Sequence, residues 1–85
     1  MLKIIISLPV YNEESIILNS IRKLSNHCFL HLTNYDWKII IADNNSTDRT
    51  AEIAKKLERE YNGKIFYKFI PQKGKGLAIR ESWQY

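Results

Sequence analysis

The feature that most constrains the fold of this chain is a threefold alternation of apolar runs with helical patterns. Residues 2–10 (LKIIISLPV), 37–42 (WKIIIA) and 64–70 (KIFYKFI) are short runs rich in β-branched and aromatic residues, as is typical of strands. A polar cluster and then a stretch with helical spacing follow each run. This order predicts a parallel β-sheet joined by right-handed helical crossovers, and therefore an α/β fold.

The three strands are expected to differ in burial. Residues 2–10 are apolar on both faces and predict a buried strand, and residues 37–42 predict a second one, whereas residues 64–70 alternate imperfectly and predict a strand nearer an edge. Residues 34–36 predict a turn before the second strand. The expected apolar stripes are Ile16, Ile17, Ile21, Leu24 and Cys28 on the first helix, and Ala51, Ala54, Leu57 and Tyr61 on the second.

Polar residues predict where the helices begin and end. Asn12 is a good cap for the first helix, with Glu13 in the first turn, where a carboxylate suits the helix dipole. Ser46 or Thr47 is the corresponding cap of the second helix. The first helix is expected to end within residues 28–33, and Gly63 to stop the second by adopting a positive φ.

Length and composition predict one small globular domain. The chain has 85 residues, 45% of them hydrophobic, and a net charge of +4 that favours anionic partners or a solvated lysine-rich surface. Its single cysteine, Cys28, excludes an intrachain disulfide and fits a reducing compartment. No apolar run approaches the ~20 residues of a membrane-spanning helix, and the start lacks a cleavage site, so a soluble, cytoplasmic chain is expected.

Polar side chains follow each predicted strand, at the edge of a parallel sheet where ligands bind. Tyr11, Asp43 and the basic loop containing Lys75 are therefore expected to line a common rim. An aromatic ring can stack on a base, a carboxylate can accept a hydrogen bond from a base or a ribose, and lysines with loop amides can neutralise a diphosphate. The sequence thus predicts a nucleotide site.

Simpler roles exist for the same residues. Tyr11 is equally suited to packing against the sheet, and Asp43 to turn chemistry. Lys73 and Lys75 alone suit a solvated loop, and scattered basic residues argue against nucleic-acid binding. His27 and His31 lack further ligands at metal spacing and are expected at the surface, whereas Cys28, Trp37 and Trp83 are expected to pack.

Three motifs in register resemble those of family 2 glycosyltransferases, which invert the configuration of the transferred sugar. Residues 7–14 (SLPVYNEE) look like the opening strand and turn of that family. Residues 39–50 (IIIADNNSTDRT) resemble its second signature, in which two aspartates and a glycine usually precede Ser-Thr-Asp. Residues 73–80 (KGKGLAIR) are similar to its basic, glycine-containing turn that opens a helix. The asparagine-rich second motif also occurs in polyprenyl-phosphate and dolichyl-phosphate sugar transferases.

The resemblance implies a GT-A fold: a three-layer α/β/α domain with a Rossmann-like parallel sheet. Residues 1–85 would form its nucleotide-binding N-terminal half. The nucleotide-binding positions that it implies are Pro9, Tyr11, Glu13, Asp43, Asn44 and Lys75. Pro9, Tyr11 and Glu13 would line the nucleoside pocket, Asp43 would contact the base, and Lys75 would lie near the pyrophosphate or base edge. Asn44 and Asn45 replace the usual second aspartate and glycine.

The resemblance also implies groups that these residues do not carry. A divalent metal, Mg²⁺ or Mn²⁺, is expected in the full-length enzyme, held by an Asp-x-Asp motif on a later strand, and the catalytic base lies further on. Residues 1–85 are therefore expected to bind a nucleoside diphosphate sugar but not to transfer the sugar. The uncapped last helix suggests that the domain continues, and the uncovered apolar surface and sheet edge predict self-association. Association of the full-length parent with the cytoplasmic face of a membrane is left open.

Other functional classes fit less well. A non-catalytic nucleotide- or protein-binding α/β module remains the alternative to an enzyme fragment. A dinucleotide-dependent oxidoreductase needs glycines in the first strand–helix turn, and residues 9–13 contain none. Residues 73–77 do not match the longer glycine loop of a P-loop NTPase. A receiver domain would need an acidic pair after the first strand and a phosphoacceptor aspartate after the third.

Overall fold

The computed structural model describes residues 1–71, which form three strands and two helices in alternation. The elements are β1 (Leu2–Val10), α1 (Ile17–His31), β2 (Tyr35–Asp43), α2 (Thr50–Glu60) and β3 (Ile65–Phe69). The strands make one sheet in the order β1-β2-β3, and both neighbouring pairs are parallel. The predicted α/β fold with a parallel sheet is therefore confirmed.

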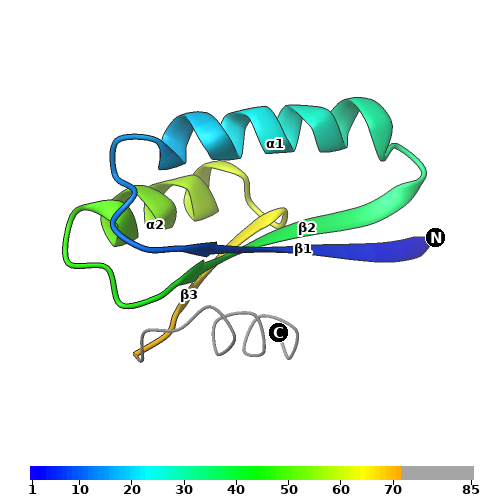
Figure 1. The fold of residues 1–85 in the computed structure, drawn as a ribbon. Helices are drawn as coiled ribbons and strands as arrows, with labels where there is room; N and C mark the ends of the chain where they lie inside the picture. The colour runs from blue at the N-terminus through cyan, green and yellow to red at the C-terminus, as the bar shows by residue number, and fades with distance from the viewer. Residues whose placement is uncertain (72–85) are drawn as a thin grey trace.

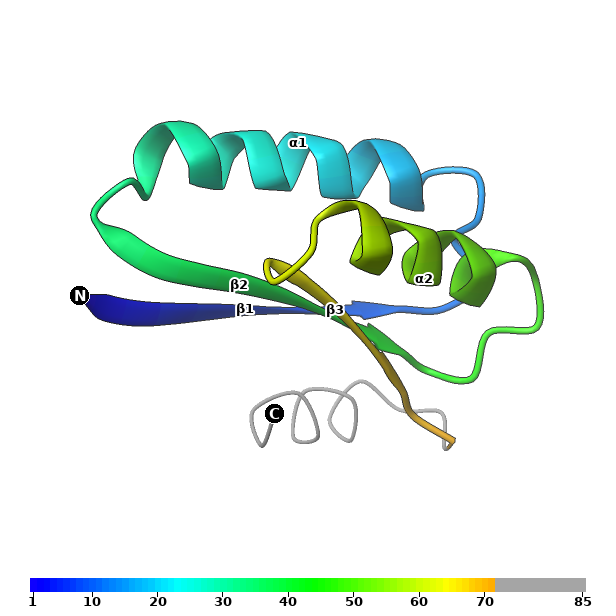
Figure 2. The same cartoon turned by 180° about the vertical axis from the view of Figure 1, so that it is seen from behind.

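Both helices cover the same face of the sheet, as the two opposite views in Figures 1 and 2 show. This follows from topology, because two right-handed crossovers that advance in the same direction place their helices on the same side. The predicted three-layer fold needs a helix on the other face of the sheet, and the sequence predicts it from residue 77 onward. That segment lies outside the described residues. Within residues 1–71, no helix combines the length and the apolar character needed to cross a membrane.

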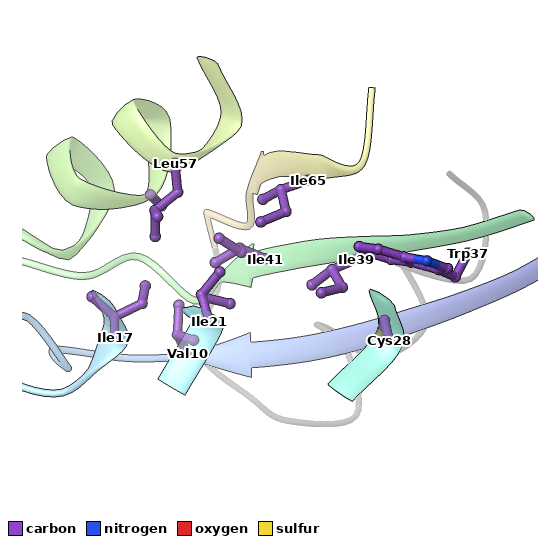
Figure 3. Packing of buried hydrophobic residues seen from close by; sticks show 10 residues of the cluster. Val10, Ile17, Ile21, Cys28, Trp37, Ile39, Ile41, Leu57 and Ile65 are labelled. Atoms are coloured by element: carbon purple, nitrogen blue, oxygen red, sulfur yellow. The ribbon is translucent and has the colours of Figure 1, made fainter. Parts of the chain in front are cut away.

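The main core lies between the central strand β2 and the two helices. Trp37, Ile39 and Ile41 alternate along β2 toward the helices, and each is at most 3% exposed. Figure 3 shows the α1, α2 and β3 side chains that meet them. The buried members of this cluster are Val10, Ile17, Ile21, Cys28, Trp37, Ile39, Ile41, Ala54, Leu57 and Ile65. Because the carboxyl-terminal part of β2 is buried, its register fixes the position of the residues that follow its carboxyl end.

The prediction that β1 is a buried strand is wrong for the described residues. Leu2 is 72% exposed and Ile5 48% exposed, because β1 pairs with β2 alone and the described helices cover only one of its faces. The central strand is β2, which starts at Tyr35 and so includes two residues of the predicted turn. The edge position of β3 is confirmed within the same part of the chain.

The predicted helix starts are also wrong. Helix α1 begins at Ile17, with Ile16 at the cap position, and α2 begins at Thr50, with Arg49 at the cap position. Neither cap residue makes a side-chain capping bond. The predicted cap Asn12 instead has a φ of 49° and lies outside the helix. The predicted ends hold better: α1 ends at His31, and Gly63 has a φ of 88° after α2.

Candidate functional site: a cleft at the carboxyl end of β1

The turns that follow β1 and β2 lie side by side at the carboxyl edge of the sheet (Figure 1). We call residues 11–16 the first turn and residues 44–49 the second turn. The Asn44 amide donates to the Val10 carbonyl at 2.8 Å, which extends the pairing with β1 one residue beyond the end of β2. Two of the three polar clusters therefore share a rim, as the sequence predicted.

Asn12 links the two turns. Its side-chain Oδ1 accepts hydrogen bonds from the backbone N–H of Thr47 at 2.7 Å and of Asp48 at 3.3 Å. Its own backbone N–H donates to Ser46 Oγ at 2.9 Å. Asparagine tolerates the left-handed backbone that Asn12 adopts better than most residues do. The side chain predicted to cap α1 therefore binds backbone amides of the neighbouring turn instead.

A second set of bonds joins the ends of the turns. The Glu13 N–H donates to Thr50 Oγ1 at 2.8 Å, and the Glu14 N–H donates to Asp48 Oδ2 at 3.2 Å. Asp48 also accepts hydrogen bonds from the Thr50 amide and hydroxyl. Desolvation raises the pKa of Asp48, but the hydrogen bonds from Thr50 and Glu14 outweigh it, so the net pKa is lowered. The ionised Asp48 carboxylate thus accepts hydrogen bonds from one amide of the first turn and from the first amide of α2.

A cleft of about 370 Å³ lies beside the first turn. Its lining residues are Leu8, Pro9, Val10, Tyr11, Glu13 and Asn44. Four predicted site residues, namely Pro9, Tyr11, Glu13 and Asn44, are thus brought together. Tyr11 is 39% exposed. Asn44 Oδ1 is buried and has no hydrogen-bond partner among residues 1–71, which is uncommon for a buried amide oxygen.

Asp43 does not line this cleft. It is fully buried, and its Oδ1 accepts a hydrogen bond from the Ser46 backbone N–H at 2.9 Å. Its Oδ2 accepts a hydrogen bond from the Tyr67 hydroxyl at 2.7 Å. The bond to Ser46 is the turn chemistry that the sequence analysis weighed for Asp43. The predicted contact of Asp43 with a base stays a prediction, and in this conformation its carboxylate has no exposed surface.

Tyr67 is a partner of the predicted site residue Asp43 that was not identified from the sequence. Its pKa is raised, first by burial and then by the hydrogen bond to the Asp43 carboxylate, so the hydroxyl remains a donor. One signal was present: Tyr67 lies in a predicted strand, and a tyrosine that packs in a strand needs a polar partner for its hydroxyl. That partner, Asp43, could not be identified from the sequence, because it lies 24 positions earlier.

The remaining site predictions concern lysines and metals. Lys75 lies outside the described residues. Within residues 1–71, no group of three or more His, Cys, Asp or Glu side chains is arranged to hold a metal ion. His27 and His31 are both exposed on α1, with ring centroids 4.5 Å apart. The residues described here therefore do not fit the expected divalent metal, and no chemical step is assigned to it.

Comparison with known proteins identifies the family. The family model described as "Glycosyl transferase family 2" matches residues 5–85. The chain is also similar to UDP-N-acetylglucosamine--dolichyl-phosphate N-acetylglucosaminyltransferase of Methanococcus voltae, with 47% identity over 51 residues. That alignment covers 60% of this chain and only 18% of the length of the curated relative. No solved structure matches the chain. Because the family model spans nearly all of the sequence, the chain belongs to glycosyl transferase family 2.

Proposed function

We propose that the protein to which this chain belongs transfers a sugar from a nucleoside diphosphate sugar to an acceptor with inversion. Residues 1–71 supply one wall of the donor's nucleoside pocket. The observation that carries the proposal is the cleft that Pro9, Tyr11, Glu13 and Asn44 line. It joins an aromatic ring, a carboxylate and an amide at the sheet edge where α/β proteins bind ligands.

Asn44 is the residue that we propose to contact the base. Its Oδ1 is buried without a hydrogen-bond donor among residues 1–71, so the amide would have to turn into the cleft to accept one, and its Nδ2 then offers a donor beside it. A base edge with an N–H next to a carbonyl complements this pair, and both uracil and guanine have such an edge. The relative from Methanococcus voltae is named for a UDP-sugar donor, which favours uracil. Tyr11 would then stack on the base or the ribose, and Glu13 would accept a hydrogen bond from a ribose hydroxyl.

The other predicted contacts have different roles in this proposal. Asp43 holds the second turn through Ser46, and Asn44 carries the base contact in its place. Lys75 is proposed to lie near the pyrophosphate of the donor. The expected Mg²⁺ or Mn²⁺ would neutralise charge on the diphosphate, with ligands beyond the described residues.

The acceptor is proposed from the relative alone. That protein is named for transfer to dolichyl phosphate, so a polyprenyl phosphate is the acceptor class that we propose here. Such an acceptor resides in a membrane, and the protein would meet it at the cytoplasmic face. Because the chain spans only 18% of the relative's length, the acceptor site is expected in other parts of the parent.

The proposal is tested by adding UDP to the ¹⁵N-labelled 85-residue chain and following amide chemical shifts. Shifts should cluster at Tyr11, Glu13 and Asn44, and an equal concentration of CDP should bind more weakly because cytosine lacks the N3–H. Asn44→Leu should weaken UDP binding about tenfold, since a hydrogen bond in a buried site contributes about 1–2 kcal/mol. Asn19→Leu, on the exposed surface of α1, is the matched control and should change nothing. Shifts that avoid the cleft, or none at saturating UDP, would rule out this nucleoside site.

A further inference from the structure

Within residues 1–71, the buried Asp43 carboxylate has few hydrogen-bond partners. In that part of the chain its two oxygens accept one hydrogen bond each, from Ser46 N–H and Tyr67 Oη, and neither donor is a cation. A buried carboxylate that loses a partner retains the full cost of its desolvation. The position of this carboxylate is therefore sensitive to the loss of either donor, and Tyr67 is the one that comes from a separate strand.

Tyr67 is itself fixed by α2. Glu58 Oε2 accepts a hydrogen bond from the Tyr67 backbone N–H at 3.1 Å. Lys55 Nζ lies 5.4 Å from the centroid of the Tyr67 ring, within the range of a cation–π contact. Lys55 and Glu58 are three residues apart on the same helix and so share one face. The hydroxyl thus reaches Asp43 from a side chain that is held at both its backbone and its ring.

A chain of hydrogen bonds continues from Asp43 to the cleft. Ser46 N–H donates to Asp43, and Ser46 Oγ accepts the backbone N–H of Asn12. Asn12 lies between Tyr11 and Glu13, which line the cleft on the β1 side. Asn44, which lines it on the β2 side, is bonded covalently to Asp43. Both walls of the cleft are therefore connected to the carboxylate that Tyr67 holds.

We infer that Tyr67 is a positioning residue of the donor site, which orders the second turn through Asp43 and the first turn through Ser46. The role of the cleft in holding a nucleoside rests on the proposed function, whereas the ordering of the turns does not. Loss of the hydroxyl should loosen the amides of the second turn selectively, and the core amides of β2 should keep their protection.

The experiment compares Tyr67→Phe with Tyr61→Phe in the 85-residue chain. Each variant deletes one hydroxyl, and the Tyr61 hydroxyl bonds to Arg22, away from the cleft. Hydrogen exchange should be about tenfold faster at Ser46 N–H in Tyr67→Phe, with core amides such as that of Ile39 unchanged. Binding of UDP should weaken about tenfold. Tyr61→Phe should change neither, and equal effects of the two variants on Ser46 and on UDP would overturn the inference.

A second comparison tests whether Tyr67 acts through Asp43. In an Asp43→Ala background, Tyr67→Phe should not speed hydrogen exchange at the Ser46 amide any further. A general packing role of Tyr67 would instead speed this exchange by the same factor in wild type and in Asp43→Ala. If wild type does not bind UDP, the proposed function fails, and exchange at Ser46 alone decides the inference. If Tyr67→Phe does not fold, Glu58→Ala replaces it, because that change removes the acceptor of the Tyr67 amide. It should also speed hydrogen exchange at Ser46 selectively, but by a smaller factor.

Discussion

Replacing Asn12 by alanine should destabilise the chain more than its exposed position suggests. The change removes the acceptor of the Thr47 and Asp48 amides, at about 0.5–1.5 kcal/mol per bond. It also forces alanine into a left-handed conformation that costs about 1 kcal/mol. The expected loss of unfolding free energy is therefore about 2–4 kcal/mol. At a slope of about 1 kcal/mol per M, the urea midpoint should fall by roughly 2–4 M.

Two further variants separate the causes of that loss. Asn12→Gly relieves the backbone strain and keeps only the loss of the acceptor, so it should cost less than alanine. Asn12→Asp keeps an acceptor oxygen and a residue type that tolerates positive φ, so it should lie nearest to wild type. Asn26→Ala on the exposed surface of α1 is the control, and it should be neutral or slightly stabilising because alanine favours helix. An Asn12→Ala midpoint within about 0.5 M of wild type would refute the reasoning, because the link between the turns would then contribute nothing.

Three other outcomes are expected. The hydrogen bond from Arg22 lowers the pKa of Glu60, so this pair stabilises the fold at neutral pH and the contribution is lost as pH falls below about 4.3. Glu60→Gln should therefore have a lower urea midpoint than wild type at pH 7 and a smaller difference from it at pH 3, and a constant difference would contradict this. Burial raises the pKa of the Cys28 thiol, so iodoacetamide should label it only as urea unfolds the chain, and rapid labelling of the native state would contradict its burial. Leu2 and Ile5, which are exposed on the edge strand β1 of the described sheet, should make sedimentation concentration-dependent and Ile5→Lys should reduce this, whereas a monomer at all concentrations would exclude self-association.

The elements of the fold were predictable because their signals are local. The isoleucine-rich runs and the helical spacing of Ile17, Ile21 and Cys28 specified strands and a helix, and the alternation specified a parallel sheet. The order of strands was not predictable in the same way. Runs that are apolar on both faces look alike whether a strand is central or at an edge, so β1 was expected to be buried in the same way as β2.

The helix starts were misassigned for a different physical reason. A side chain such as Asn12 or Ser46 can satisfy backbone amides of its own helix or those of a neighbouring turn. Composition favours the local option, because the neighbouring turn is 34 residues away in the sequence. Only the parallel pairing of β1 with β2 brings the second turn close enough to compete. The residues that gather at the rim were therefore predictable, and their partners were not.

Strand geometry explains why Asp43 is buried whereas Asn44 lines the cleft. Side chains alternate between the two faces of a strand, so Asp43 continues the face of Trp37, Ile39 and Ile41, which packs against the helices. Asn44 comes one position later and lines the cleft. A family pattern with two adjacent polar residues does not by itself say which one is buried. Alternation of apolar and polar residues along the strand would have shown which face is buried, but residues 38–42 are apolar on both faces apart from Lys38. Once the core face of β2 is known, the buried position carries an internally bonded group, and the proposed base contact is expected at its neighbour.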